Sequence, residues 1–150
     1  ISKVAVRVAC KQSNARFVVA STMRLPFLSK AFDAVTVIMA PTSSDIPRVL
    51  KQGALLCRVS PGENHLVELR KLAYREVRAV KQPRMDIDGL TNVGCERVQF
   101  DTLLKDDGLV DLIAMTPMQF RTSKDFREQV SQIDQLCVTA DFRVDLFRKD

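Results

Sequence analysis

Apolar residues in the first half of the chain gather in short, nearly continuous runs separated by longer amphipathic segments. Runs of this length that are rich in β-branched side chains are typical of strands covered on both faces. The segments between them carry apolar residues at helical spacing, as Leu66, Leu69 and Ala73 do. We therefore predict strands at residues 16–20, 34–39 and 54–60, and helices at residues 2–12, from Ser43 or Ser44 to about 52, and 64–80.

The second half of the chain ends in its cleanest alternating pattern. Between residues 136 and 147, six apolar side chains from Leu136 to Leu146 occupy every second position, and more polar ones lie between them. This period of two predicts a strand with an apolar face toward the core. We also predict a strand at residues 95–104, a short helix at 108–116, a helix at 123–133 capped by Ser123, and a loop at 81–92.

Together these patterns predict an α/β protein with a mostly parallel sheet that ends in antiparallel C-terminal strands. Continuous apolar strands that alternate with helices favour parallel pairing, whereas the final alternating strand suits an antiparallel edge. The same layout serves many chemistries, so the pattern by itself names no function. Gly53 follows the predicted second helix at the place of a C-terminal glycine, and Pro61 and Gly62 predict a turn after the third strand.

Composition narrows the range of partners. The net charge of +5 and the pI of about 9.2 favour a polyanionic partner. No apolar run approaches the roughly 18 residues of a membrane span, and the first residues lack the apolar stretch of a signal peptide. The four cysteines lie tens of residues apart without zinc-ligand spacing, which predicts reduced thiols in a cytoplasmic protein and no metal site.

Four short motifs follow one another in a specific order. They are Arg24-Leu25-Pro26-Phe27, Phe32-Asp33-Ala34-Val35, Arg48-Val49-Leu50-Lys51-Gln52-Gly53, and Ser60-Pro61-Gly62-Glu63-Asn64-His65-Leu66. This series resembles class I S-adenosylmethionine-dependent methyltransferases. The Pro-Gly-x-x-His-Leu stretch, together with Ala40-Pro41 and the later Met115-Thr116-Pro117, is similar to the 23S ribosomal RNA (guanine-N1) methyltransferases. The resemblance covers essentially the whole chain and is densest before Val77.

The chain also departs from this family. Gln52 and Ala54 replace residues of the usual Lys-Pro-Gly-Gly motif, and Thr42 stands where family members carry a cysteine. The family's zinc-binding module, glycine-rich cofactor loop and first two strands have no counterpart here. We therefore expect residues 1–150 to be a truncated methyltransferase catalytic domain with a partial Rossmann-like sheet. Zinc is expected only in the missing N-terminal module.

The resemblance implies roles for several residues at strand ends. His65 would contact S-adenosylmethionine, and Ala20 and Ser21 would lie near its adenine. Pro41 and Thr42 would border the methyl-accepting base. Each position has a structural alternative: His65 as a surface histidine at a helix start, Ser21 as a loop cap, and the segment around Pro41 as a strand-to-helix turn. The sequence identifies no general base. Glu63 is a carboxylate close in sequence to His65, but no catalytic role is assigned to it.

A basic run follows the predicted third strand. Lys71, Arg75 and Arg78 would share one face of a helix over residues 64–80 and could contact RNA phosphates, or could form a solvated helix face. The resemblance implies methyl transfer to N1 of a guanine in 23S ribosomal RNA. The alternatives are methylation of another substrate and a non-catalytic RNA-binding fragment. The strands at 16–20 and 34–39 would lack partners, so a homodimer through strand edges is a further expectation.

Overall fold

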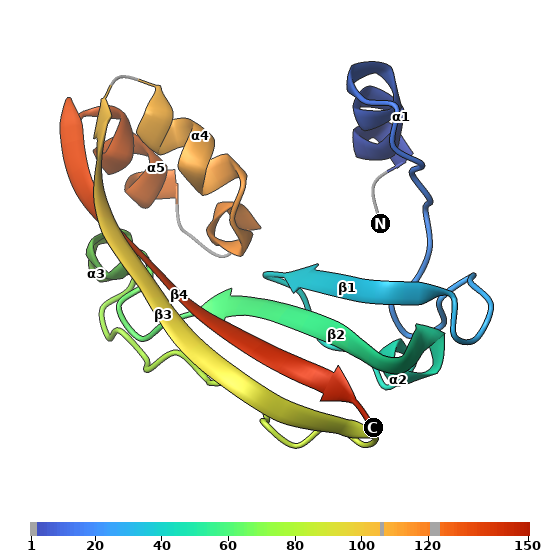
Figure 1. Cartoon of the computed structure of the whole chain (residues 1–150). Coiled ribbons are helices and arrows are strands. Elements are labelled where there is room, and N and C mark those ends of the chain that lie inside the picture. Colours follow the sequence, from blue (N-terminus) through green and yellow to red (C-terminus); the bar gives the residue numbers. More distant parts are fainter. Residues whose placement is uncertain (1–2, 106, 121–123) are drawn as a thin grey trace. The chain divides into compact units, whose positions relative to one another are not determined.

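The computed structural model describes residues 3–105, 107–120 and 124–150. Four strands form one mixed sheet in the order β1-β2-β4-β3, accompanied by helices (Figure 1). The elements are α1 (Lys3–Gln12), β1 (Phe32–Ile38), α2 (Ile46–Val49), β2 (Leu50–Pro61), α3 (Val67–Ala73), β3 (Leu90–Lys105), α4 (Gly108–Ala114), the 3-10 helix η1 (Pro117–Phe120), α5 (Lys124–Ser131) and β4 (Gln135–Lys149).

The strand directions agree with the predicted α/β class. β1 and β2 are parallel, because Lys30 and Ala31, just before β1, donate backbone hydrogen bonds to Arg48 and Val49, just before β2. β4 is antiparallel to both neighbours. It meets β2 through pairs such as Arg58 with Asp145 and Gly62 with Asp141, and it meets β3 through pairs such as Asn92 with Leu146 and Arg97 with Asp141. The mostly parallel sheet with an antiparallel C-terminal strand is confirmed.

The first predicted strand does not form. Residues 16–20 have no regular secondary structure, and Phe17, Val18 and Val19 are between 37% and 52% exposed. A β-branched run becomes a strand only when another strand satisfies its backbone groups, and none among the described residues pairs with it. The prediction for 34–39 is confirmed as β1, which pairs with β2 alone among the strands that the structure describes and so lies at an edge of the sheet. Pairing of that edge with a second copy stays a prediction.

Two predicted helices are much shorter than expected. The segment after Ser43 forms only the single turn α2 with Asp45 as its N-cap, and β2 already begins at Leu50. Gly53 therefore does not end a helix. It lies inside β2 with a φ of 73°, a conformation that glycine adopts without strain. The helix predicted over 64–80 is limited to α3, since the backbone becomes extended at Tyr74.

The remaining helices agree better with the sequence pattern. The helix predicted at 108–116 is α4, and the helix predicted at 123–133 is α5; Ser123 lies outside the described residues. α1 buries none of its residues, and its valines Val4 and Val8 are at least half exposed. The described part of the chain has no helix long and apolar enough to cross a bilayer. None of the four cysteines forms a disulfide.

The chain divides into two compact units with separate cores. Unit 1 comprises Ile1–Arg58, Arg84–Gly94 and Asp145–Asp150, and unit 2 comprises Val59–Pro83 and Cys95–Val144. The core of unit 1 consists of Ile46, Leu50, Ala54, Leu56, Leu90 and Phe147. The core of unit 2 consists of Leu66, Leu69, Leu109, Ile113, Phe126, Val130 and Val138. In unit 2 the helices α3, α4 and α5 thus supply most of the apolar side chains that pack against β4.

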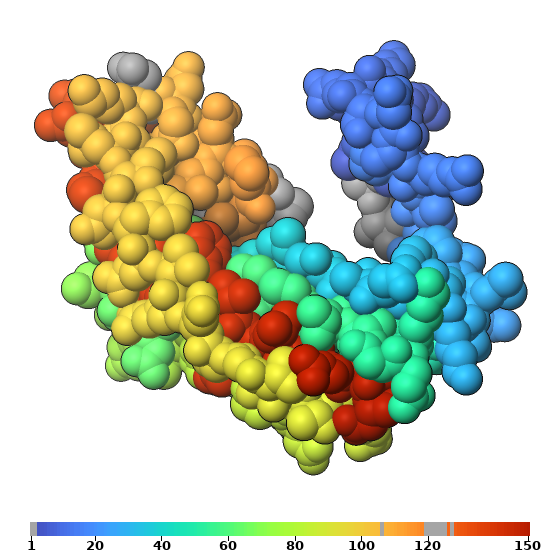
Figure 2. All heavy atoms as spheres, viewed as in Figure 1, coloured from blue at the N-terminus to red at the C-terminus, as the bar shows by residue number. Residues whose placement is uncertain are grey.

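The alternating pattern of β4 predicts the strand correctly but misjudges which side chains are fully buried. Phe142, Val144 and Leu146 of the apolar series are only partly buried, whereas Asp141 and Asp145 of the other series are fully buried. Buried carboxylates are tolerated only when paired and hydrogen-bonded, and each of these accepts from an arginine. β3, at the edge of the sheet, leaves most of its side chains uncovered (Figure 2).

Candidate active-site turn and its surroundings

The turn that follows β2 is bonded to β4 at several points. The Gly62 N–H donates to the carbonyl of Asp141 at 2.9 Å, and the Asn64 N–H donates to its Oδ2 at 2.8 Å. The Leu66 N–H donates to the carbonyl of Thr139 at 2.8 Å. These bonds replace the β2–β4 ladder where β2 ends, so the Pro-Gly-x-x-His sequence is held in one conformation.

Asp141 organises this turn. Arg97 donates two hydrogen bonds to its carboxylate, both at 2.8 Å, which is the bidentate geometry that guanidinium and carboxylate groups favour. These hydrogen bonds from Arg97 lower the pKa of Asp141, although burial opposes them. A Cβ on Gly62 would lie 2.3 Å from the Asp141 carboxyl group. Position 62 therefore requires glycine because the buried carboxylate occupies the space of a side chain.

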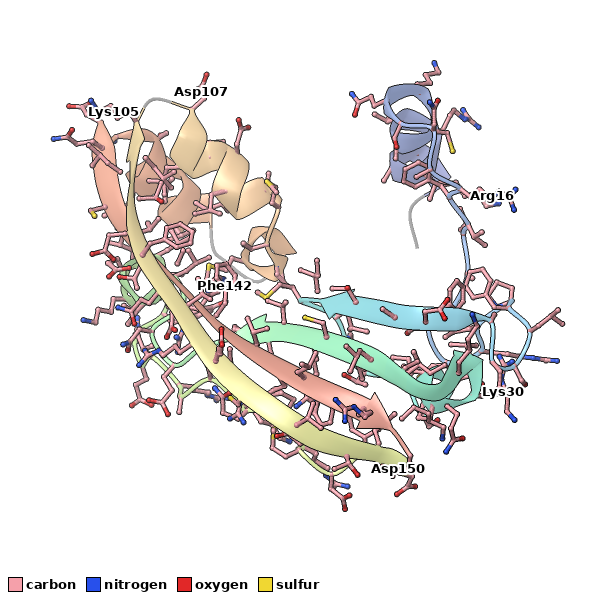
Figure 3. The ribbon with its side chains drawn as sticks, viewed as in Figure 1. Arg16, Lys30, Lys105, Asp107, Phe142 and Asp150 are labelled. Atoms are coloured by element: carbon pink, nitrogen blue, oxygen red, sulfur yellow. The ribbon has the colours of Figure 1, made fainter. Side chains whose placement is uncertain are left out.

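A backbone hydrogen bond holds the imidazole of His65 beside Asp141. The backbone N–H of Asp141 donates to Nδ1 of His65 at 3.3 Å, so the neutral imidazole carries its proton on Nε2. Desolvation lowers the pKa of His65, and the proximity of Asp141 opposes this effect. The imidazole ring lies 4.8 Å from the ring of Phe142, and the ring of Phe100 lies 6.4 Å from that of Phe142. Phe142 is labelled in Figure 3. A neutral histidine with an Nε2–H can donate to an anionic oxygen.

Two residues just past strand ends adopt left-handed backbone conformations. Met39 follows β1 and Leu66 follows the turn after β2, each with a φ of 51°. Left-handed backbone costs non-glycine residues free energy and is concentrated at functional sites. Both positions lie at the carboxyl ends of the parallel strands, where doubly wound sheets bind their ligands.

The loop with the Leu-Pro-Phe motif is fixed by an ion pair. Arg48 and Asp45 are joined at 2.6 Å, and Arg48 also donates to the carbonyls of Leu25 and Phe27. The Leu25 N–H donates to Asp45 at 2.7 Å. The hydrogen bonds from Arg48 lower the pKa of Asp45 to about 2. Arg48 therefore braces this loop from the helical turn α2, which precedes β2.

The predicted cofactor and substrate residues lie in different local settings. The hydroxyl of Ser21 accepts the N–H of Met23 at 3.2 Å, so it caps its own loop. Ala20 and Thr42 are half-buried, whereas Pro41 is exposed. Glu63 is exposed in the turn beside His65. Within the described ranges, no group of three or more His, Cys, Asp or Glu side chains could hold a metal ion.

The basic residues do not share a helix face. Lys71 is exposed on α3, but Arg75 and Arg78 lie beyond the C-terminal end of that helix. Glu68, which the sequence sets against this positive charge, is bound instead by the Thr139 N–H at 2.9 Å and the Thr139 hydroxyl at 2.8 Å. The Arg97–Asp141 pair is a site feature that the sequence analysis missed, because its two residues are 44 positions apart and share no motif.

The donor set around the turn can be compared with the needs of S-adenosylmethionine. The Nε2–H of His65 fits an anionic group such as the carboxylate of its methionine part. The motifs of the chain match no glycine-rich loop and no acid for the ribose. The residues present therefore fit one end of the cofactor.

Comparisons with known proteins support the fold. No protein-family model matches the chain. Over 129 residues it is 26% identical to YxjB of Bacillus subtilis (strain 168), proposed to be a 23S rRNA (guanine-N(1)-)-methyltransferase; the match covers 82% of the chain and 46% of YxjB. The chain thus spans about half the length of this curated relative.

Several solved structures share the fold at low sequence identity. BH2331 of Bacillus halodurans C-125, proposed to be a methyltransferase, matches with a TM-score of 0.51 and 15% identity over 98% of this chain and 78% of its own. YcgJ of Bacillus subtilis matches with a TM-score of 0.54 and 18% identity over 99% of this chain and 80% of its own. MccD matches with a TM-score of 0.54 and 17% identity over 100% of this chain and 78% of its own. The chain therefore has the Rossmann-like α/β fold of class I methyltransferases.

Proposed function

We propose that the complete protein transfers a methyl group from S-adenosylmethionine to N1 of a guanine in 23S ribosomal RNA. The observation that carries the proposal is the similarity to YxjB over 129 residues, on a chain with a methyltransferase fold. The ordered motifs ending in Pro61-Gly62-Glu63-Asn64-His65 and the positive net charge support it. The cofactor supplies, when bound, a methyl group activated by its sulfonium.

The residues of this chain would bind and position the reactants. We assign His65 to the cofactor carboxylate through its Nε2–H, and Ala20 and Ser21 to the neighbourhood of the adenine. Pro41 and Thr42 would border the guanine, which must leave any base stack to expose N1. Alignment of the acceptor nitrogen with the methyl carbon is a major source of rate in such reactions. No general base is assigned; Glu63, in the turn beside His65, is the first carboxylate to vary.

The proposal is tested by incubating the complete protein with methyl-labelled S-adenosylmethionine and 23S ribosomal RNA, followed by nucleoside mass spectrometry. We expect 1-methylguanosine. We also expect His65→Ala to raise the KM for the cofactor by about tenfold, which corresponds to one hydrogen bond to a charged group. Ser13→Ala, at an exposed position outside the proposed site, is the control. Methylation of another nucleoside or of a small molecule only, or no methylation, would contradict the proposed substrate.

The 150-residue chain alone should bind S-adenosylmethionine weakly. It offers His65 and strand-end backbone but no match to a glycine-rich loop or a ribose-binding acid. Isothermal titration calorimetry on the chain should therefore show no binding in the micromolar range. Micromolar affinity would mean that the described residues form a complete cofactor site.

A further inference from the structure

A pocket lies where the chain leaves α3. The helix ends at Ala73, and Tyr74 is extended with φ and ψ of −132° and 137° while its N–H closes the last helical turn on the carbonyl of Arg70 at 3.0 Å. The segment after Tyr74 then turns back along the helix. Arg75 and Arg78, two of the three basic residues that the sequence places on one helix face, line this pocket together with Arg70.

Arg70 holds the two sides of this pocket together. Its Nη1 donates to the carbonyls of Glu63 at 3.1 Å and His65 at 3.4 Å, and its Nη2 donates to the carbonyl of Arg78. All three acceptors are neutral backbone groups. The ion pairs found among the described residues do not include Arg70, and its hydrogen bonds connect the pocket to the turn that carries His65.

The pocket is positively charged and of suitable size for a nucleotide. It has a volume of about 720 Å³ and is lined by Arg70, Tyr74, Arg75, Glu76, Arg78, Ala79 and Val80. Three guanidinium groups and one carboxylate give the lining a formal charge of +2. The ion pairs found among the described residues include neither Arg75 nor Arg78, and both side chains are exposed. Ligand pockets of small molecules commonly measure about 300–1,000 Å³.

The chemistry of the lining has two parts. Exposed guanidinium groups bind phosphate through paired N–H donors. The half-buried ring of Tyr74, beside Ala79 and Val80, offers an aromatic and apolar wall against which a base can stack. A base inside a duplex cannot reach such a wall, whereas an unpaired base can.

We propose that this pocket binds one unpaired nucleotide of an RNA strand, with its phosphate at Arg75 and Arg78 and its base against Tyr74. The choice of RNA rests on the proposed function. The pocket deepens that function because it gives the protein a means to select single-stranded segments near the turn that holds His65. It adds a base-binding element to the phosphate contacts expected from the basic sequence.

The test is fluorescence anisotropy of the full 150-residue chain with a labelled single-stranded RNA 12-mer, without S-adenosylmethionine. Arg75→Gln/Arg78→Gln should weaken binding about tenfold. It should also reduce the salt dependence, because each lost phosphate contact lowers the slope of log K against log salt by about 0.7. Arg7→Gln/Lys11→Gln, on the exposed face of α1, removes the same charge and should have a much smaller effect.

Variants of Tyr74 distinguish a nucleotide-binding site from a surface that binds any anion. Tyr74→Leu should weaken binding of the 12-mer about tenfold and leave an abasic strand of the same length unaffected, while Tyr74→Phe should bind both normally. Equal losses in the arginine variant and the α1 control would overturn the proposal. So would an unchanged affinity of Tyr74→Leu, or equal binding of duplex RNA.

A negative result for the nucleotide pocket can be distinguished from a negative result for the proposed methyltransferase function. Methylation of 23S ribosomal RNA by the complete protein is measured independently. If 1-methylguanosine forms but the pocket variants bind RNA normally, the pocket assignment is wrong and the enzyme assignment holds. If the pocket variants lose RNA binding but no methylated guanosine forms, the pocket assignment holds and the enzyme assignment is wrong.

Discussion

Asp145 and Asp141 lie four residues apart on β4, one in each unit, and each carboxylate accepts hydrogen bonds from an arginine. The Arg58–Asp145 pair is enclosed, with exposed side-chain fractions of 3% and 0%. Arg58 also donates to the carbonyl of Arg84 at 2.7 Å and lies 4.9 Å from the Phe147 ring centroid. In the other pair, Asp141 is equally buried, but Arg97 is 54% exposed.

This difference separates a structural ion pair from one at a candidate site. Arg58 and Asp145 are both buried, so the pair fixes the packing of unit 1. Arg97 reaches solvent, and the carboxylate it holds also positions the turn with Gly62, Asn64 and His65. Similar arginine–aspartate chemistry therefore stabilises the core in one unit and orders a binding turn in the other.

The largest effect is expected from Asp145→Asn. This change leaves the Arg58 guanidinium buried without a counter-charge, which typically costs about 3–5 kcal/mol. Asp141→Asn should cost only about 1–2 kcal/mol, because the freed Arg97 can be hydrated and loses one set of hydrogen bonds. Urea unfolding measures both values. Equal losses in the two variants would contradict the distinction between the pairs.

The next effect concerns Gly62. A methyl group at this position would meet the Asp141 carboxyl at 2.3 Å, so Gly62→Ala must displace the turn or the carboxylate. Overpacking of this kind costs about 1–3 kcal/mol, occasionally more. Gly94→Ala is the matched control, since its Cβ would lie 4.0 Å from Leu146. A Gly62→Ala protein as stable as Gly94→Ala would show that the turn is not held against Asp141.

These two predictions rest on contacts that the sequence could reveal only in part. The pattern of residues 136–147 predicts β4, and the Pro61-Gly62 pair predicts a turn, since both signals are local. That Asp141 and Asp145 are buried depends on Arg97 and Arg58, which are distant in sequence. Periodicity assigns polar residues to solvent and has no means to detect such partners.

Tertiary context also explains the predicted elements that do not form. Residues 16–20 have the composition of a strand but no neighbouring strand to pair with. The apolar spacing of residues 64–80 continues past Ala73, yet Tyr74 leaves the helix and Arg70 instead binds the carbonyl of Arg78. In both segments, the tertiary surroundings override the local preference, by lack of a pairing strand in the first and by the Arg70–Arg78 contact in the second.

A smaller effect should appear in acid. The pKa of Asp141 in the folded protein is lowered chiefly by Arg97, so the unfolded chain takes up the proton first. The stability that Asp141 contributes is therefore complete above its unfolded pKa of about 4 and is lost as the pH falls through its folded pKa. Urea midpoints between pH 6 and pH 3 should decline less steeply in Asp141→Asn than in the unmodified chain. Parallel declines would contradict this assignment.

The smallest expected effect is the titration of His65, and it tests whether the turn around Asp141 is as ordered as the geometry indicates. Desolvation lowers the pKa of this imidazole below the ordinary value of about 6.5. The unfolded chain therefore binds the proton first, and protonation as the pH falls below 6.5 destabilises the folded state. Because the chain has a single histidine, one imidazole resonance in an NMR titration reports the midpoint directly.

Phe142→Leu should move that midpoint back toward 6.5, since the Phe142 ring lies 4.8 Å from the imidazole and shields it from water. Phe100→Leu serves as the control, because Phe100 contacts Phe142 and is itself 53% exposed. A midpoint at or above 6.5 in the unmodified chain would mean that the imidazole is not desolvated in this turn. In that case the packing of Phe142 against the imidazole, and with it the ordered surroundings of His65 in this turn, would be contradicted.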